Sequence, residues 1–428
     1  MKISSNNTPF YDRDRETRDW SERRRELNTR FLQTLRHAYD HSSAYREMYD
    51  AAGIDLSTIQ SLEDIEKLPL LRMTDLVARQ RRVFPFGGFE ILDPKELHRI
   101  YVNSGLLFQP GGEWESQDTS WAQALCGAGF KAGDRIINTF NYHLWPFARA
   151  MEESSKKIGA TVIPAGAGNT MMQVKILQML EVNGFLGTPS FLTTLVQRAE
   201  GMGLDLRKDV FLETALVSAE MLPESLRARL QEKLDMTVRQ AYGTVFLGCI
   251  GFECRVMTGL HVPDSICVEI VDPGTGRHVS AGSVGEIVAT SFSPSYPMIR
   301  MATGDLSCVS DETCPCGRTG PLLKKIIGRM DQATKVKGVF IHPWQADEVM
   351  ARYREVFKYQ IVITRKNYID LMTVIVELKE DIPETLSLQR RMEREIEEML
   401  GVRGSVQIVP RGTLPDRHRK IEDQRKWD

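Results

Sequence analysis

The beginning of the chain carries the pattern of an amphipathic helix. Residues 13–52 are highly charged, and from Leu27 to Tyr39 apolar side chains recur at helical spacing, with arginine and glutamate on the other face. Leu27, Phe31 and Leu35 therefore lie on one face of a helix. We interpret residues 13–52 as helical surface structure that covers one edge of a larger sheet.

Short apolar runs and helical segments alternate in the region from residue 96 to residue 250. The apolar runs are Ile136–Ile137, Thr161–Pro164, Phe185–Leu186 and Thr214–Val217. Helical segments, such as residues 170–183 and 224–234, separate them. This alternation predicts an α/β fold, with a large region of mostly parallel sheet flanked by helices on both faces.

Loops rich in small residues follow several of these runs. They comprise residues 165–168, 187–190 and 218–220. Ligands of parallel sheets bind beyond the carboxyl ends of the strands. We therefore expect these loops to contribute to a site as a group.

Beyond residue 252 the pattern changes from helical to alternating. Residues 268–271 and 284–288, with a glycine-rich turn between them, predict a β-hairpin. After Gly328 the pattern predicts a small mobile α+β lid, whose charged tail from Arg417 to Asp428 we expect to be frayed. We therefore expect a domain over residues 1–327, with a β-rich part at about 252–327, and a lid domain over 328–428.

Charge and composition exclude several classes of function. The chain has 428 residues and a net charge of −2, which gives no general attraction to nucleic acid or to an anionic membrane. No apolar run is long enough to span a bilayer, and the N-terminus lacks the apolar segment of a secretory signal. Seven cysteines, an odd count, indicate free thiols and a cytoplasmic protein.

Two short clusters offer ligands for a metal ion. Cys254 and His261 have six residues between them, and Cys314 and Cys316 flank a proline. Three thiolates and an imidazole suit a closed, tetrahedral structural zinc site without an open position for catalysis. The alternative is that these cysteines are buried thiols that act as small apolar side chains. Cys308 is a spare candidate ligand; the cysteines expected in the core are Cys126, Cys249 and Cys267.

Several motifs occur in a fixed order toward the C-terminus. They are PMIRMATGDL at 297–306, CPCGR at 314–318, GRMDQATKVKGVFIHP at 328–343 and GTLPDRHRK at 412–420. With AYG at 241–243 and GTPSF at 187–191, they make the chain resemble the adenylate-forming ligase superfamily, and within it phenylacetate–CoA ligases and relatives that adenylate a deazaflavin coenzyme. The resemblance covers nearly the whole chain. It implies that ATP adenylates a carboxylate and that coenzyme A then displaces AMP.

The resemblance also implies roles for individual residues. The adenine wall would consist of Ser218, Ala219, Glu220, Tyr242 and Gly243. Asp305 would hold the ribose hydroxyls, Arg329 would lie at the nucleotide, and Asp331 would be the hinge. Lys420 would stabilise charge during adenylation, and Lys337 would lie near coenzyme A. Without the resemblance, Lys420 is one basic residue of a charged tail.

The chain departs from the superfamily at the loop that holds the phosphates. The corresponding residues are 103–110, where Ser104 and Gly105 keep the expected types. Two hydroxyl residues of the superfamily loop are replaced by Leu106 and Leu107, a glycine by Phe108, and the lysine by Gln109. Phe246 stands where the superfamily places a glutamate that helps hold magnesium. Leucine and phenylalanine cannot donate hydrogen bonds to phosphate.

Three functions stay open after this departure. The protein adenylates an acid with magnesium-ATP, using backbone amides and other cations. Or it transfers an already activated acyl group without ATP. Or it binds a nucleotide or acyl group without turnover and regulates an active relative. A plain binding module is a further alternative, because a fold alone does not determine function.

The resemblance places the pocket for the carboxylate substrate at an aromatic segment and at the start of a later helix. Its residues are Tyr142, His143, Trp145 and Pro189. Aromatic and apolar lining favours an aromatic or bulky apolar acid. His143 either holds the carboxylate or is a hydrogen-bonded structural histidine. The expected partners are a small-molecule carboxylate, a nucleotide and coenzyme A, and a homodimer is common in the superfamily.

Overall fold

The computed structural model describes residues 8–103, 106–310, 312–330, 334–336, 339–341, 343–366, 369–380, 385–415 and 419–425. They form two compact units. The first unit comprises the chain up to Thr303 and the segment Ser307–Ile326. The second unit comprises Gly304–Leu306 and the chain from Ile327 onward. The sequence pattern put the boundary at residues 327 and 328 and did not anticipate the transfer of Gly304–Leu306.

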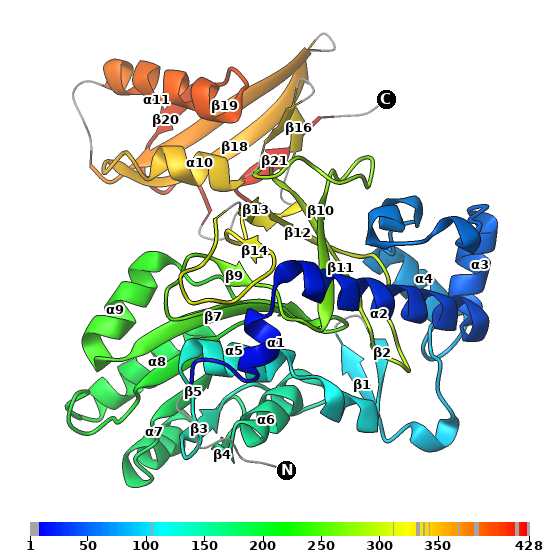
Figure 1. The fold of residues 1–428 in the computed structure, drawn as a ribbon. Helices are drawn as coiled ribbons and strands as arrows, with labels where there is room; N and C mark the ends of the chain where they lie inside the picture. The colour runs from blue at the N-terminus through cyan, green and yellow to red at the C-terminus, as the bar shows by residue number, and fades with distance from the viewer. Residues whose placement is uncertain are drawn as a thin grey trace. The chain divides into compact units, whose positions relative to one another are not determined.

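Three helices form the N-terminal region. They are α1 (Arg13–Thr17), α2 (Trp20–His41) and α3 (Ser43–Ala51), with α2 the long blue helix in Figure 1. The helical prediction for residues 13–52 is confirmed with two breaks. Asp19 and Ser42 cause the breaks, because their side chains accept backbone hydrogen bonds from Ser21 and Tyr45 and so begin new helices.

Short elements connect this region to the main sheet. They are η1 (Leu56–Thr58), η2 (Leu62–Lys67), α4 (Met73–Arg82), η3 (Pro94–Glu96), β1 (Arg99–Asn103), β2 (Leu107–Gly111) and η4 (Glu113–Gln117). β1 and β2 pair antiparallel as a hairpin. No helix that the structure describes combines the length and the apolar character of a membrane span.

The main sheet of the first unit has nine strands among the described residues, in the order β13-β14-β9-β8-β7-β6-β5-β3-β4. The strands are β3 (Arg135–Asn138), β4 (Thr161–Pro164), β5 (Gly184–Gly187), β6 (Thr214–Val217), β7 (Thr237–Thr244), β8 (Gly248–Glu253), β9 (Leu260–His261), β13 (Val309–Ser310) and β14 (Leu322–Leu323). The strands from β3 to β7 are parallel, which confirms the prediction from the alternating pattern. The other four continue the sheet antiparallel.

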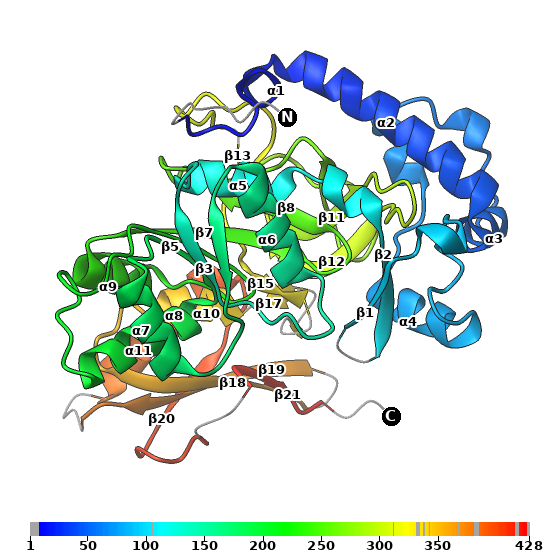
Figure 2. The same cartoon turned by 90° about the horizontal axis from the view of Figure 1, so that it is seen from below.

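Helices cover both faces of the parallel part (Figure 2). They are α5 (Ser120–Ala128), α6 (Phe147–Lys157), α7 (Thr170–Met179), α8 (Pro189–Gly201) and α9 (Glu224–Leu234). Ile136 and Leu216 pack with α5 and α6, whereas Ile137 and Val217 pack with α7, α8 and α9. Because successive strand side chains point to opposite faces, each short apolar run supplies both cores.

A second sheet has the order β10-β11-β12-β15. Its strands are β10 (Ile266–Val271), β11 (Gly285–Ser291), β12 (Met301–Ser307) and β15 (Gly328–Arg329). The predicted hairpin is confirmed as the antiparallel pair of β10 and β11. Side chains of α2 and α3 share one core with this region. The Tyr45 hydroxyl donates to the Pro297 carbonyl and accepts from the Ile299 amide, each at 2.9 Å.

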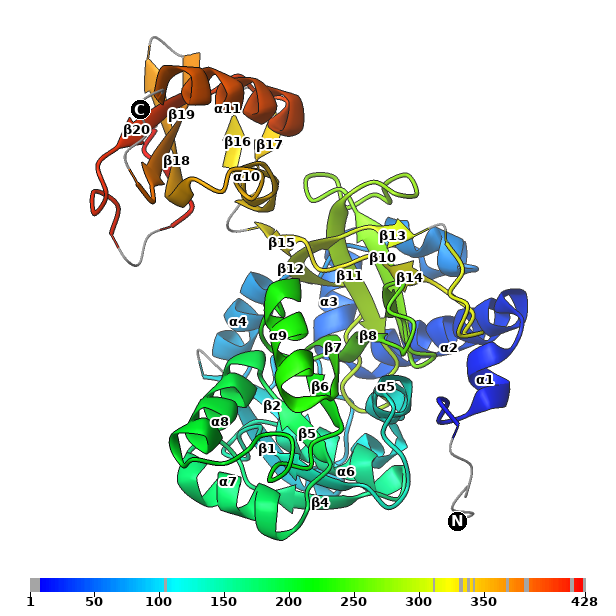
Figure 3. The same cartoon turned by 90° about the vertical axis from the view of Figure 1, so that its left-hand side faces the viewer.

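The second unit contains a sheet in the order β20-β19-β18-β21 and a separate β16–β17 pair. Its elements are β16 (Thr334–Val336), β17 (Val339–Ile341), α10 (Pro343–Met350), β18 (Val356–Lys366), β19 (Ile369–Leu378), α11 (Thr385–Leu400), β20 (Ser405–Val409) and β21 (Ile421–Asp423). Figure 3 shows α11 along this sheet. The expectation of a frayed tail is wrong for residues 419–425, because β21 pairs parallel with β18 and buries Ile421.

Candidate functional site

The small-residue loops meet at the carboxyl edge of the parallel sheet. The amides of Ala165 and Gly166 both donate to the Asn138 carbonyl at the end of β3, at 3.1 and 3.0 Å. The Thr139 amide donates to Leu186 of β5 at 2.8 Å, and the Ser218 amide donates to Gly187 at 3.2 Å. These loops therefore lie together as expected, and their contribution to a site stays a prediction.

Glu220 joins two of the loops. Its carboxylate accepts hydrogen bonds from the Ser190 hydroxyl at 2.8 Å and the Ser190 amide at 3.2 Å. The Gln240 side chain of β7 donates to the Glu220 carbonyl at 3.4 Å. Ala219, which precedes Glu220 in the chain, has a φ of +68°, a conformation that few residues other than glycine adopt. The structure thus brings together Ser218, Ala219 and Glu220 in a constrained turn, with the Pro189–Ser190 helix start beside it.

Tyr242 and Gly243 lie on β7 just beyond the end of β6. Val217, the last residue of β6, pairs with Gln240 of β7. Tyr242 is two residues further along β7, beyond the point where β6 ends and the Ser218 loop begins. A side chain at Gly243 would come within 2.3 Å of the Gly248 carbonyl, which explains why only glycine fits there. Phe246, further along, is 7% exposed and belongs to the core that also holds α2 and α3.

The segment that corresponds to the phosphate loop is largely a hairpin. Leu107 pairs with Asn103 and Gln109 with Tyr101, so Leu107, Phe108 and Gln109 are strand residues of β2. Leu107 is 7% exposed, whereas Leu106 is 74% exposed and has φ of +58°. Ser104 and Gly105 lie outside the described residues. The apolar side chains at 107 and 108 therefore pack against the core of the first unit.

Asn103, the last residue of β1, has an unsatisfied carboxamide. The residue is 7% exposed, and both its Nδ2 and its Oδ1 are buried without a hydrogen-bond partner among the described residues. Leaving such a group unpaired costs roughly 1–3 kcal/mol. A buried orphan at the entrance to the phosphate segment is a place where a polar ligand would complete the hydrogen bonding.

The aromatic segment after β3 lies beside this hairpin. The Val102 amide of β1 donates to the Leu144 carbonyl at 2.9 Å. The Tyr142 hydroxyl accepts from the Asn138 side chain at 2.9 Å, and burial raises the pKa of this phenol. His143 is exposed and Trp145 is 39% exposed, so neither belongs to the core. Pro189 is buried in the first turn of α8.

Asp305 and Arg329 lie side by side in the second unit. They face each other across the β12–β15 pair, and Arg329 Nη1 is 3.4 Å from Asp305 Oδ1. Gly304 has φ of +76°, and a side chain there would lie 3.5 Å from Arg329 Nη2. The carboxylate and guanidinium predicted to contact the nucleotide are thus adjacent. Asp331 and Lys337 lie outside the described residues.

Lys420 is held by residues of its own unit. Its ammonium forms an ion pair with Asp347 of α10 and lies 5.7 Å from the centre of the Tyr359 ring. The Tyr359 hydroxyl also donates to Asp347, and burial raises the pKa of this phenol. The Ile361 amide of β18 donates to the Lys420 carbonyl at 2.7 Å. The backbone at Lys420 is therefore anchored, while its side chain is about half exposed.

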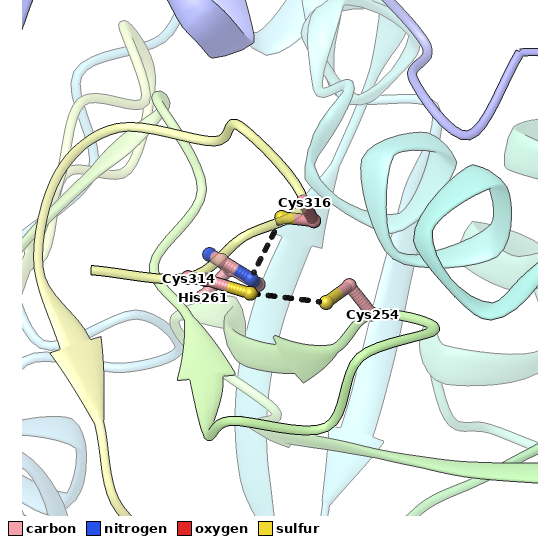
Figure 4. A group of neighbouring side chains, drawn as sticks. All are labelled: Cys254, His261, Cys314 and Cys316. Atoms are coloured by element: carbon pink, nitrogen blue, oxygen red, sulfur yellow. Dashed lines mark hydrogen bonds between the residues drawn. The ribbon is translucent and has the colours of Figure 1, made fainter. Parts of the chain in front are cut away.

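The four predicted metal ligands converge in the first unit (Figure 4). Cys254 follows β8, His261 is in β9, and Cys314 and Cys316 are in the loop between β13 and β14. Pairing of β9 with both β8 and β14 brings these segments together. The ligand atoms all lie within 4.8 Å of one another, and all but Cys316 are buried. Cys308 is outside this group.

The spacing of the group suits a tetrahedral ion. Cys254 and Cys314 have their sulfurs 3.6 Å apart, and Cys316 Sγ lies 3.4 Å from His261 Nε2. A tetrahedral zinc with Zn–S bonds of about 2.3 Å requires sulfurs roughly 3.8 Å apart. Backbone amides also point at the sulfurs: Val256 donates to Cys254 at 3.4 Å and Arg318 to Cys316 at 3.5 Å. Such outer contacts orient metal ligands.

Two residues that contact Lys420 escaped prediction from the sequence. Asp347 and Tyr359 carry no local signal, because their pairing with Lys420 joins segments more than sixty residues apart in the sequence. Asn103 was included in the segment that corresponds to the phosphate loop, but without a role of its own.

Comparison with known proteins agrees with this geometry. A family model described as "AMP-binding enzyme" matches residues 117–293, and one described as "AMP-binding enzyme C-terminal domain" matches residues 338–425. A phenylacetate–coenzyme A ligase of Thermus thermophilus is 29% identical over 93% of this chain and 95% of its own length. A phenylacetate–coenzyme A ligase of Escherichia coli K12 is 28% identical over 89% of this chain and 90% of its own length.

Solved structures agree as well. An open conformation of 2-hydroxyisobutyryl-CoA ligase, solved with 2-HIB-AMP and CoA, is similar with a TM-score of 0.87 and 25% identity over 99% of this chain and 96% of that one. The likeness therefore covers both units of the fold. These findings confirm the resemblance of the chain to the adenylate-forming superfamily, with matches to both domains of the AMP-binding enzymes.

Proposed function

We propose that the protein is an AMP-forming acyl-CoA ligase for an aromatic or otherwise bulky apolar carboxylic acid. An oxygen of the carboxylate attacks the α-phosphorus of ATP, and pyrophosphate leaves. The thiol of coenzyme A then attacks the carbonyl carbon of the acyl adenylate, and AMP leaves as the thioester forms. The cost of each step lies in negative charge that develops on oxygen, which positioned cations and amides stabilise.

The observation that carries the proposal is the meeting of three loops at one edge of the parallel sheet. Ser218–Glu220, Ser190 and the end of β7 are joined there through Glu220. Ligands bind at this edge in open α/β sheets. The relatives matched over about nine-tenths of this chain are named as phenylacetate–coenzyme A ligases, which supports the same reaction class.

The chain retains groups that fit an adenosine phosphate. The orphaned carboxamide of Asn103 offers a donor and an acceptor next to the phosphate segment. Asp305 supplies a carboxylate for ribose hydroxyls, and Arg329 supplies a guanidinium for phosphate oxygens. Lys420 would supply positive charge during adenylation, as the family pattern implies. The chain therefore has candidate binding residues for the parts of the nucleotide that take part in the first half-reaction, but no candidate ligand for its magnesium ion.

Magnesium does not fit at the position where the superfamily holds it. Phe246 has no ligand atom and is packed in the core. We therefore route no step through a protein-bound magnesium at this position. Magnesium would reach the site with ATP, bound to the phosphates.

Zinc fits the group formed by Cys254, His261, Cys314 and Cys316, and we propose a structural ion there. The ligand set is closed and the outer contacts are present. The ion would link the β8–β9 connection to the loop between β13 and β14. It takes no part in the reaction.

The remaining partners are predictions. Coenzyme A would bind near Lys337, and a homodimer would match the common assembly of the superfamily. The cytoplasm is the expected compartment, because the proposed zinc ligands need reduced thiols.

The proposal is tested by pyrophosphate release from magnesium-ATP, measured with a panel of acids that includes phenylacetate, benzoate and 2-hydroxyisobutyrate. We expect release only with an acid present, and acyl-CoA formation when coenzyme A is added. Absence of both with every acid, in a protein that retains its fold and zinc, would contradict the proposal. Thioester formation from chemically prepared acyl adenylate separates a lost first step from a lost second one.

A second function, ATP-independent acyl transfer or binding without turnover, is favoured by one specific observation. Leu107 and Phe246 are core residues where the superfamily has polar groups for the triphosphate and its metal. Calorimetric titration with magnesium-ATP and with AMP separates the two functions. Binding of both supports the ligase, whereas binding of AMP alone supports the second function.

The burial of Leu107 and Phe246 also predicts how the chain responds to restoration of the family residues. Phe246→Glu places a carboxylate in the core and should lower the free energy of unfolding by about 3 kcal/mol or more. Leu107→Thr should cost about 2 kcal/mol. Leu106→Asn, at an exposed position with positive φ, should change stability by less than about 0.5 kcal/mol. Urea unfolding measures all three; an unchanged midpoint for Phe246→Glu would contradict the core assignment.

A further inference from the structure

The first unit contains a cavity of about 540 Å³ away from the loops described above. It lies between α2, η2, β10 and the segment after β10. Most of its wall is apolar, from residues that include Leu27, Leu62, Val262, Ile266, Val268 and Val279. Cavities that bind small molecules have volumes of roughly 300–1,000 Å³ and largely apolar walls. None of the residues predicted to bind nucleotide or acid lines it.

One buried cation in the wall has incomplete hydrogen bonding. Arg23 of α2 lines the cavity and is only 6% exposed. Its Nη1 donates to the Thr319 carbonyl, but its Nε is buried without a hydrogen-bond partner in the part of the chain that the structure describes. No ion pair joins Arg23 to a carboxylate of the described chain. A guanidinium that is desolvated and unpaired is costly, because buried charges are ordinarily paired.

The nearby carboxylates are bound to other cations. Glu16 pairs with Arg318 at 2.7 Å, and Asp264 pairs with Arg15 at 3.0 Å. Asp264 also accepts a hydrogen bond from the Gln123 side chain. The negative charge of these carboxylates lowers the free-energy cost of burying the Arg23 guanidinium. Neither carboxylate forms an ion pair with Arg23, however.

The acidic residue in the cavity wall is also neutralised. Glu269 of β10 accepts two hydrogen bonds from Arg300 Nε, at 3.1 and 3.2 Å, and one from Arg300 Nη2 at 2.8 Å. His278 lies 2.9 Å from the same carboxylate, and this contact raises the pKa of His278. The cavity therefore presents an apolar wall with a surplus positive charge at Arg23.

We propose that this cavity is a binding site for an organic carboxylate with an apolar aliphatic or aryl body. The apolar body lies against the α2 and β10 walls, and the carboxylate pairs with Arg23. A guanidinium matches a carboxylate in geometry and charge, so a carboxylate bound in the cavity would supply the ion pair that Arg23 lacks among the described residues. This site is separate from the sheet-edge loops and does not depend on whether the protein is a ligase.

Calorimetric titration of the full-length, zinc-loaded protein with decanoate tests the proposal. Arg23→Met should weaken binding at least tenfold, because it removes the charge and keeps most of the side-chain length. Ala281→Trp, at an exposed position on the cavity rim, should weaken it similarly by filling the space while Arg23 stays in place. Arg24→Met is the matched control: Arg24 also lines the cavity but is half exposed and paired with Glu63, so we expect a change of less than twofold.

Trp145→Ala distinguishes this site from the predicted acid pocket at the sheet edge. Decanoate affinity should be unchanged in Trp145→Ala and at least tenfold weaker in Ala281→Trp. Three results would each overturn the proposal. The first is weaker binding in Trp145→Ala with unchanged binding in Ala281→Trp. The second is an equal loss of affinity in Arg23→Met and Arg24→Met, and the third is no decanoate binding to the unmodified protein. If Arg23→Met fails to fold, judged by circular dichroism, the Ala281→Trp result still decides the question.

Discussion

Replacement of Lys420 by alanine should lower the rate of acid-dependent pyrophosphate release by about 10²- to 10³-fold. The physical reason is the loss of a positive charge that would face developing oxyanion charge during adenylation. The second half-reaction should change little, because formation of the thioester from a supplied acyl adenylate does not involve this lysine. Single-turnover measurements of the two half-reactions give the two rates separately.

Two variants serve as controls for this prediction. Lys379→Ala removes an exposed lysine of the same unit and should leave both rates unchanged. Asp347→Asn removes the carboxylate that holds the Lys420 ammonium, and the first rate should rise about two- to fivefold, since an exposed ion pair is worth at most about 1 kcal/mol. A Lys420→Ala variant that slows both half-reactions equally would show that the lysine acts on structure rather than on adenylation.

Removal of a metal ligand should have the largest effect on stability. Cys314→Ser should lower the free energy of unfolding of the first unit by about 4 kcal/mol, because zinc ligation is coupled to folding. The zinc content, measured by mass spectrometry, should fall from one ion per chain toward zero. Thermal unfolding with a strong chelator should reproduce the destabilisation in the unmodified protein.

Cys308→Ala is the matched comparison for the metal ligand. Cys308 is a buried cysteine next to β13 but lies outside the four-residue group. We expect it to retain full zinc content and to lose only about 1 kcal/mol from the shortened side chain. Equal losses in the two variants, or purified protein without zinc, would contradict the metal assignment and favour buried thiols.

The parallel sheet was predictable because four of its strands, β3 to β6, are short, apolar and each followed by a helical segment. Apolar residues at Ile136 and Ile137 must face opposite sides of the sheet, so the two helical layers follow from the pattern itself. The breaks at Asp19 and Ser42 were missed, because the apolar stripe continues past them and only the capping hydrogen bonds reveal them. The strand β21 was missed because its charged neighbours conceal a single buried residue, Ile421.

The site was predictable where its chemistry is local or its motif is long. The convergence of Cys254, His261, Cys314 and Cys316 could be predicted because thiols and an imidazole gather in two short segments. In contrast, the sequence does not reveal that Leu107 faces the core while Leu106 faces solvent, because this depends on the hairpin register. The ion pair of Lys420 with Asp347 depends on tertiary contact and is equally invisible in the sequence.

The junction of the N-terminal helices with the chain near residue 298 has a consequence for biosynthesis. Tyr45 is bonded to Pro297 and Ile299, and Phe31 and Leu35 share a core with Met298. At roughly 5–20 residues per second, a ribosome needs on the order of ten to fifty seconds to make the intervening chain. The apolar stripe of α2 has no native partner during that time. Nascent chains that stop before residue 297 should therefore bind chaperones or aggregate, whereas chains released beyond the zinc ligands can complete the first unit.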